Sequence, residues 1–188
     1  MKKLLGVLGL VVLFSVPLKA QVTPKFQVSA GYLFDSFQTS ATYNTSLHLN
    51  GLYGSLDYNP LRRIGAEVQY SQGVKDQGTL GDNSLYTFMI GPQIYPFGHR
   101  HISVYGHVLL GEGYYRLSYP AQGGFPATVN TDSSLTWQAG AGVDVTVKKA
   151  WGIRLLEADY GHTDFFGARP GQGSIRISFG FVYHFGAK

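Results

Sequence analysis

The chain has 188 residues, of which 15 are lysine or arginine, 11 are aspartate or glutamate, and none is cysteine. A chain without cysteine has neither a disulfide framework nor a thiol nucleophile. Its 25 glycines, 13 tyrosines and 12 phenylalanines, with only 14% charged residues, favour β-strands and argue against a helical fold or a disordered secreted chain.

Residues 1–20 have the order of a secretory signal peptide. Two lysines give a positive start, an apolar run covers residues 4–14, and cleavage is expected after Ala20. This run is shorter than the about 20 apolar residues that a membrane-spanning helix needs. Its removal takes three of the 15 basic residues away and leaves 12 against 11 acidic ones, a formal net charge of +1. The sequence therefore predicts a signal peptide (1–20) and one β domain (21–188), and it gives no support to a nucleic-acid partner.

Eight segments of the remaining chain alternate between apolar and small or polar residues, as strands with two different faces do. They are expected at 25–34, in a stretch ending at Tyr58, and at 64–72, 85–97, 102–115, 135–147, 152–162 and 175–185. Pro92 removes a ladder hydrogen bond from the fourth segment and predicts a bulge there. In the seventh, a bulge at Leu155–Leu156 is needed to bring Arg154 onto the face of Glu157 and Asp159.

The connections between these segments alternate in length. Long ones are expected at 36–46, 74–84, 116–134 and 163–173, and short ones at 59–63, 97–101 and 148–151. This alternation is typical of a small outer-membrane barrel, which has short periplasmic turns and longer external loops. An even number of strands places both ends of the barrel chain on the periplasmic side.

The apolar face of the segments is predicted to face lipid. If it faced inward, the outer surface would be Ser, Gly and Gln with few charges, which is unusual for a soluble protein. A soluble exported ligand-binding barrel is the alternative. In the membrane interpretation, aromatic residues near strand ends form interfacial belts. These aromatic residues are Tyr32, Tyr58, Tyr70, Trp137, Tyr183 and Phe185.

Two stretches carry a resemblance to a known family. GSLDYNPLRRIGAEVQY (54–70) is similar to the second hairpin of the transmembrane domain of outer-membrane protein A, and VDVTVKKAWGIRLLEADY (143–160) is similar to its sixth and seventh strands. The resemblance implies an all-β, eight-stranded antiparallel transmembrane β-barrel. It also implies that Phe185 acts as a C-terminal signal to the barrel-assembly machinery, although three residues follow it. No peptidoglycan-binding domain follows the barrel, so the cell-wall tethering of larger family members is not expected.

The charged and histidine residues of the inward faces form the main candidate site. They are Glu67, Asp144, Arg154, Glu157, Asp159, Arg176, His107 and His184. An eight-stranded interior is just wide enough for side chains to fill it, so charges there must pair. The resemblance places Glu67, Asp144 and Arg154 at positions where family members block or gate the interior. The network is expected to be structural, with gating of ions as the alternative.

Two weaker candidates lie near the ends of the strands. His162 with Asp159, Thr163 and Asp164 resembles the His and acid of lipid-modifying outer-membrane enzymes, without the expected serine. His99 and His101 flank Arg100 within a short turn, which is a poor arrangement for a metal site. No catalytic residue, metal or cofactor is predicted.

The predicted function is a structural or surface-interaction role in the outer membrane, with a side-chain-filled lumen. The alternatives are a narrow porin-like channel gated by lumenal charges, a soluble exported ligand-binding barrel, or a lipid-modifying enzyme. The expected partners are the outer-membrane bilayer, the assembly machinery and an unknown external partner of the loops, and the protein is expected to be a monomer.

Overall fold

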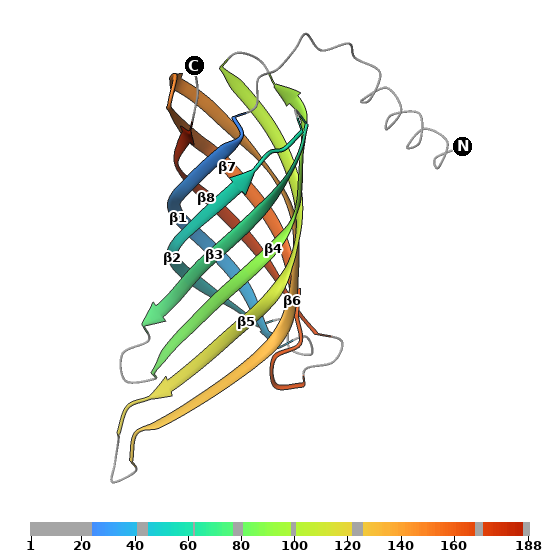
Figure 1. Cartoon of the computed structure of the whole chain (residues 1–188). Helices are drawn as coiled ribbons and strands as arrows, with labels where there is room; N and C mark the ends of the chain where they lie inside the picture. Colours follow the sequence, from blue (N-terminus) through green and yellow to red (C-terminus); the bar gives the residue numbers. More distant parts are fainter. Residues whose placement is uncertain are drawn as a thin grey trace, which may run out of the picture.

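The computed structural model describes residues 24–40, 45–61, 63–76, 81–98, 101–121, 126–167 and 171–185. This part of the chain forms eight long strands and one short 3₁₀ turn (Figure 1). The elements are β1 (Phe26–Ser40), β2 (Thr45–Tyr58), β3 (Ile64–Asp76), β4 (Asp82–Gly98), β5 (Ile102–Tyr119), β6 (Thr128–Lys148), β7 (Trp151–Thr163), η2 (Phe165–Gly167) and β8 (Gln172–Phe185). The signal peptide predicted for residues 1–20 lies outside the described residues.

The strands close into one antiparallel barrel in sequence order. Each strand pairs with the next, and β1 pairs with β8, so that Phe26 lies opposite Phe185. The first and last strands therefore begin and end at the same end of the barrel, where the short connections also lie (Figure 1). The predicted eight-stranded antiparallel fold is confirmed. Closure pairs the two strands that would otherwise be sheet edges, which a lipid environment requires.

The outer wall of the barrel is apolar. Large apolar side chains of all eight strands are exposed, including Leu52 (65%), Phe88 (56%) and Phe181 (68%). Their neighbours in sequence point inward and are buried, among them Tyr53 and Val182. The prediction that the apolar face points outward is confirmed. Among the described residues, no helix is long and apolar enough to cross a bilayer.

One of the two predicted bulges is confirmed and the other is wrong. Val143 pairs with Leu156 and Asp144 with Arg154, so Leu155 is the extra residue of β7, as expected. Leu155 and Leu156 are both exposed on the outer wall, at 57% and 48%. The register of β4 on β5 is continuous across Pro92, and the irregularity lies further on, between Ile94 and Phe97. Pro92 therefore leaves one hydrogen bond of the strand ladder unmade, but β4 has no extra residue at this point.

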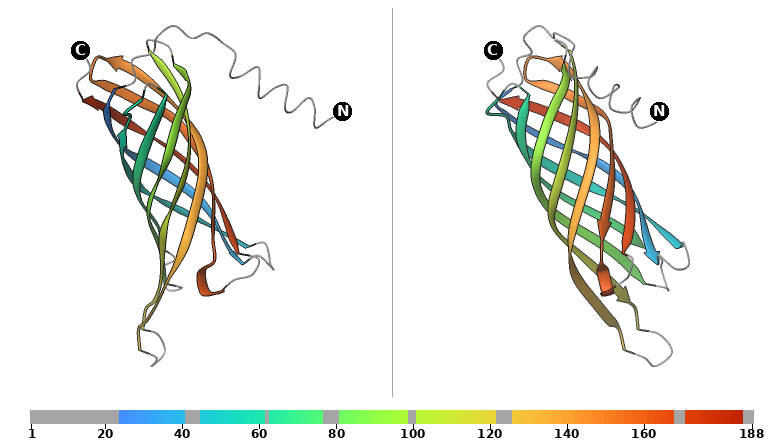
Figure 2. Two further views of the ribbon diagram at one scale, coloured as in Figure 1. Left: turned by 45° about the vertical axis from the view of Figure 1, so that its right-hand side comes forward. Right: turned by 90° about the vertical axis from the view of Figure 1, so that its right-hand side faces the viewer.

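The expected long loop at 116–134 is mostly strand, which corrects the prediction. β5 and β6 remain paired as far as Tyr119 and Thr128. The segment before Leu135 contains Thr128, Val129 and Thr131, and such β-branched residues favour a paired ribbon. Figure 2 shows this hairpin extending beyond the other strands at the loop end of the barrel.

Candidate functional site

The interior of the barrel is filled by polar side chains from the middle of the strands to the short-turn end. All eight residues of the predicted lumen set are buried there, with exposed fractions between 0% and 6%. The alternation of the strands directs them inward, and the bulge at Leu155 brings Arg154 and Glu157 onto the same face. The barrel thus collects charges from strands that are far apart in the sequence.

Arg154 lies at the centre of one group of ion pairs. Its Nε and Nη2 donate to the two carboxylate oxygens of Asp144 at 2.9 and 3.3 Å, and its Nη1 donates to Glu157 at 2.7 Å. The guanidinium lies over the Tyr105 ring, 4.5 Å from its centroid, and the Tyr105 hydroxyl donates to Glu157. This fully buried cation therefore has two carboxylates as acceptors and an aromatic ring against its face.

His107 lies at the centre of a second group. Its Nδ1 is 2.7 Å from Glu67 Oε2, and its Nε2 is 2.8 Å from Asp159 Oδ1. Asp159 also accepts from Arg176 at 3.0 and 3.1 Å. An ionised carboxylate is only an acceptor, so both nitrogens of the His107 ring must carry hydrogen. The geometry is that of an imidazolium held between two carboxylates.

Uncharged side chains join the two groups into one network. Gln69 donates to Glu67 and Glu157, both at 3.4 Å, and accepts from Arg176. Gln27 donates to Asp57 at 2.9 Å and to Asp144 at 3.4 Å. Gln93 and Ser178 add a contact each from β4 and β8. All eight strands contribute at least one side chain to this network.

Sequence reasoning selected neither the glutamines that connect the two groups nor Asp57. Asp57 is fully buried and lies opposite Glu67 in the register of β2 on β3. Gln69 follows Glu67 by two residues and therefore shares its face. The alternation of the strands was the signal that would have found both residues.

His184 is the exception within the predicted set. It is buried near the short-turn end, but neither ring nitrogen has a hydrogen-bond partner among the described residues. It belongs to the interior by position and is not bonded to the charge network.

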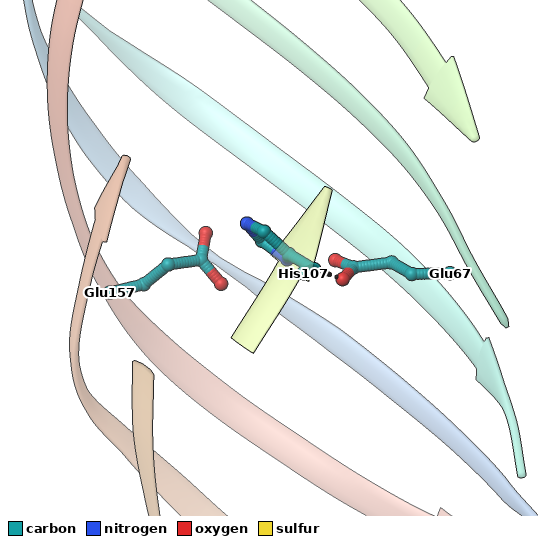
Figure 3. A group of neighbouring side chains, drawn as sticks. All are labelled: Glu67, His107 and Glu157. Atoms are coloured by element: carbon teal, nitrogen blue, oxygen red, sulfur yellow. Dashed lines mark hydrogen bonds and ion pairs between the residues drawn. The ribbon is translucent and has the colours of Figure 1, made fainter. Parts of the chain in front are cut away.

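Three residues of the network have the composition of a metal site. Figure 3 shows Glu67, His107 and Glu157 pointing toward one another from three strands, with ligand atoms within 4.8 Å. The atoms that would bind a metal are already engaged in ion pairs, because Glu67 pairs with His107 and Glu157 pairs with Arg154. The nearby guanidinium would also repel a second cation. We therefore assign this trio to the ion-pair network.

The structure separates the residues of the predicted His162 cluster. Asp159 points inward to His107, while the His162 ring lies beside Trp137, with the ring centroids 6.1 Å apart. Thr163 accepts a hydrogen bond from Thr136 at 3.1 Å, and Asp164 lies 3.7 Å from the His162 ring nitrogen. The described residues therefore do not assemble a nucleophile and base around His162. His99, of the other weak candidate pair, lies outside the described residues.

The predicted interfacial aromatics lie on the outer wall in two groups. At the short-turn end, Tyr58 stacks on Phe26 at 4.8 Å, and Tyr183 lies between Trp151 at 4.9 Å and Phe185 at 4.8 Å. Toward the loop end, Tyr32 contacts Phe34 and Phe179, Trp137 contacts Tyr160, and Tyr70 is 47% exposed.

At the loop end the interior contains a cluster of buried apolar side chains, which the sequence reasoning did not foresee. Phe165 of η2 is 1% exposed and packs 6.0 Å from Phe37 and 5.8 Å from Tyr115. The other buried members of this mouth cluster are Leu47, Leu49 and Leu85. The connection that carries Phe165 is held at its base by Asp164, whose backbone nitrogen donates to the Ser134 hydroxyl at 3.3 Å. The mouth cluster covers the outer end of the polar network.

Comparison with known proteins agrees with this architecture. The outer membrane protein β-barrel domain family model matches residues 6–185. No curated protein matches the chain. Ail of Yersinia pestis, determined in complex with the heparin analogue sucrose octasulfate, is 18% identical, with 87% of this chain and 100% of that chain covered and a TM-score of 0.64.

Two further structures have the same fold. Neisserial surface protein A (NspA) is 15% identical over 88% of this chain and 100% of its own, with a TM-score of 0.66. The N-terminal β-barrel domain of Pseudomonas aeruginosa OprF is 13% identical over 85% and 99%, with a TM-score of 0.50. At these identities the likeness concerns the fold alone. The family match over almost the whole chain shows that the protein belongs to the outer membrane protein β-barrel domain family and is a protein of the cell outer membrane.

Proposed function

We propose that this barrel is a structural, surface-presenting protein with a filled lumen, and that it does not serve as a diffusion channel. The observation that carries this proposal is the single hydrogen-bond network to which all eight strands contribute. An eight-stranded barrel has room for side chains but not for an aqueous bore beside them. Moving an ion through this interior would require several buried ion pairs to separate at once.

The loop end supports the same proposal. The mouth cluster lies in series with the polar network, so an ion would also meet an apolar layer. Beyond the mouth, the β5–β6 hairpin projects outward and exposes Tyr119 (43%) and Val129 (49%) (Figure 2). A paired two-stranded ribbon that projects beyond the other strands is suited to contacting an external partner.

The charged residues at the loop end indicate which kind of partner the hairpin would bind. Ail has been determined with a polyanion, sucrose octasulfate. Here the described residues at the loop end include Lys75 and Arg116 but also Asp82, Asp132 and Asp164. This balance does not favour a polyanionic ligand, and a partner that uses apolar and backbone contacts with the hairpin fits better.

We also propose how the chain is processed and assembled. Residues 1–20 serve as a cleavable signal peptide, and mass spectrometry of the protein from outer membranes should show that it begins at Gln21. β8, which ends at Phe185, presents the C-terminal strand to the assembly machinery. The barrel is monomeric, and its membrane-interface aromatics anchor it in the bilayer.

The test is conductance of the refolded protein in planar lipid bilayers. A filled lumen predicts no steady single-channel steps at neutral pH in molar salt. Folding is checked beforehand by gel mobility with and without heating, so that a silent bilayer cannot be due to unfolded protein. Reproducible steps from the folded protein would refute the filled-lumen proposal and establish the narrow channel.

A further inference from the structure

Charged residues are distributed unevenly between the two ends of the barrel. Of the 11 acidic residues of the chain, six are buried in the interior and five lie toward the loop end. The five are Asp76, Asp82, Glu112, Asp132 and Asp164. The short connections (59–63, 97–101 and 148–151) contain five basic and no acidic residues. The sequence of the short-turn end is therefore basic, whereas the loop end has charges of both signs.

Three exposed lysines of the short-turn end lie near one another in the wall of the barrel. Lys25 comes directly before β1, and Lys148 and Lys149 belong to the connection from β6 to β7. β7 and β1 are separated only by β8, so they lie about 10 Å apart. Lysine side chains are long and flexible, and they can reach an anion between them from both sides. Among the described residues, none of the three lysines forms an ion pair.

An aromatic band lies on the outer wall beside these lysines, across β2, β1, β8 and β7. Phe26 stacks on Tyr58 at 4.8 Å and lies opposite Phe185 in the register of β1 on β8. Tyr183 lies between Phe185 at 4.8 Å and Trp151 at 4.9 Å. Aromatic side chains of this kind are found at the level of the lipid headgroups. The lysines therefore border the band at the depth where lipid phosphates are expected.

We propose that Lys25, Lys148, Lys149 and the aromatic band bind a phospholipid of net negative charge in the periplasmic leaflet. The lysine ammonium groups donate charge-assisted hydrogen bonds to the phosphate oxygens, and the acyl chains lie against the aromatic band. The leaflet is the periplasmic one because the short turns of such barrels face the periplasm. The position of the lysines beside a lipid-facing band favours a lipid over a soluble polyanion. The site lies on the outer wall, so it does not depend on whether the lumen conducts ions.

The site selects phospholipids by the net charge of the headgroup. Phosphatidylcholine and phosphatidylethanolamine carry a cation beside the phosphate, and this cation is repelled by the lysines and finds no acidic residue in the short connections. Phosphatidylglycerol has the phosphate without the cation. A basic residue near an anionic lipid surface contributes roughly fivefold in affinity, so each lysine should favour phosphatidylglycerol by about this factor.

The test uses the two tryptophans of the chain, because Trp151 belongs to the band and Trp137 lies toward the loop end. Trp137→Phe leaves Trp151 as the only tryptophan of the refolded full protein. In phosphatidylcholine vesicles, phosphatidylglycerol with brominated acyl chains should quench Trp151 more strongly than an equal amount of brominated phosphatidylcholine. Trp151→Phe, which leaves Trp137, should show equal quenching by the two lipids.

Replacement of the three lysines by glutamine in the Trp137→Phe background should remove the preference, whereas Arg116→Gln, at an exposed position toward the loop end, should keep it. Gel mobility with and without heating checks that every variant is folded. Equal quenching of Trp151 by both lipids, an unchanged preference in the lysine variant, or the same preference at Trp137 would overturn the proposal.

A last measurement separates the lipid from a free anion. Sodium phosphate and sodium chloride of equal ionic strength should weaken the preference at Trp151 to the same extent, because screening acts on any pair of charges. A stronger effect of phosphate would show that the lysines bind the free anion, and it would overturn the assignment of the site to a lipid.

Discussion

Replacement of Arg154 by methionine tests whether the lumenal ion pairs stabilise the barrel. Methionine preserves much of the apolar stem but removes three hydrogen bonds, two to Asp144 and one to Glu157. Asp144 is 3% exposed and Glu157 is fully buried, so neither carboxylate gains water when its partner is lost. Breaking a buried pair from one side typically costs about 3–5 kcal/mol. We expect Arg154→Met to lower the free energy of unfolding by about 4 kcal/mol on this basis.

The assay is reversible urea unfolding in lipid vesicles, followed by tryptophan fluorescence, because both tryptophans are on the outer wall. Arg116→Met is the matched control, since it removes an exposed arginine of β5 and should change stability by less than about 0.5 kcal/mol. The triple variant Arg154→Met, Asp144→Asn, Glu157→Gln removes the stranded charges and should recover most of the loss. If Arg154→Met unfolds with the same free energy as Arg116→Met, the ion pairs do not carry the stability assigned to them here.

Three further predictions concern other parts of the interior. His107 should show two protonated ring nitrogens in ¹⁵N NMR spectra at neutral pH, and an unprotonated nitrogen would contradict the imidazolium geometry. Gly142→Ala should destabilise the fold by about 1–3 kcal/mol in urea unfolding, because its Cβ would lie 2.3 Å from the Tyr105 hydroxyl. Gly54→Ala meets nothing closer than 3.6 Å and should be near neutral, so equal losses in both would refute this reasoning. Phe165→Ala should empty the mouth cluster and cost about 3 kcal/mol, with faster proteolysis of the β7–β8 connection; unchanged stability would mean that the cluster does not close the mouth.

The outer wall could be predicted because lipid imposes one rule on every strand. Each second residue must be apolar whatever its neighbours are, so short alternating runs reveal both the strand and its outward face. The bulge at Leu155 was predictable for the same reason, since a buried arginine cannot share a face with the lipid-exposed Leu156.

The interior follows no such rule, and there the sequence was less informative. Leu33, Leu49 and Met89 point inward although alternation favours apolar residues on the outside. Their placement depends on the position along the barrel axis, because the polar network lies toward the short-turn end and the mouth cluster at the loop end. The position of a residue along the barrel axis depends on the register between strands, and the sequence of a single strand does not contain that information. The extension of the β5–β6 ribbon was missed because its polar residues read as a loop.

The outer wall and the interior constrain the register between strands in different ways. A slip of one residue would turn the apolar face of a strand inward, but a slip of two would keep every apolar side chain in lipid. Such a slip of β7 on β6 would move Arg154 about two strand residues, some 6–7 Å, away from Asp144, and leave buried charges unpaired. The ion pairs therefore distinguish between registers that the lipid-facing pattern leaves equivalent. Barrels of the neutralised triple variant should consequently be stable yet heterogeneous, with doubled amide NMR signals in β6 and β7. A single sharp set of signals would show instead that backbone pairing and the bulge fix the register without the charges.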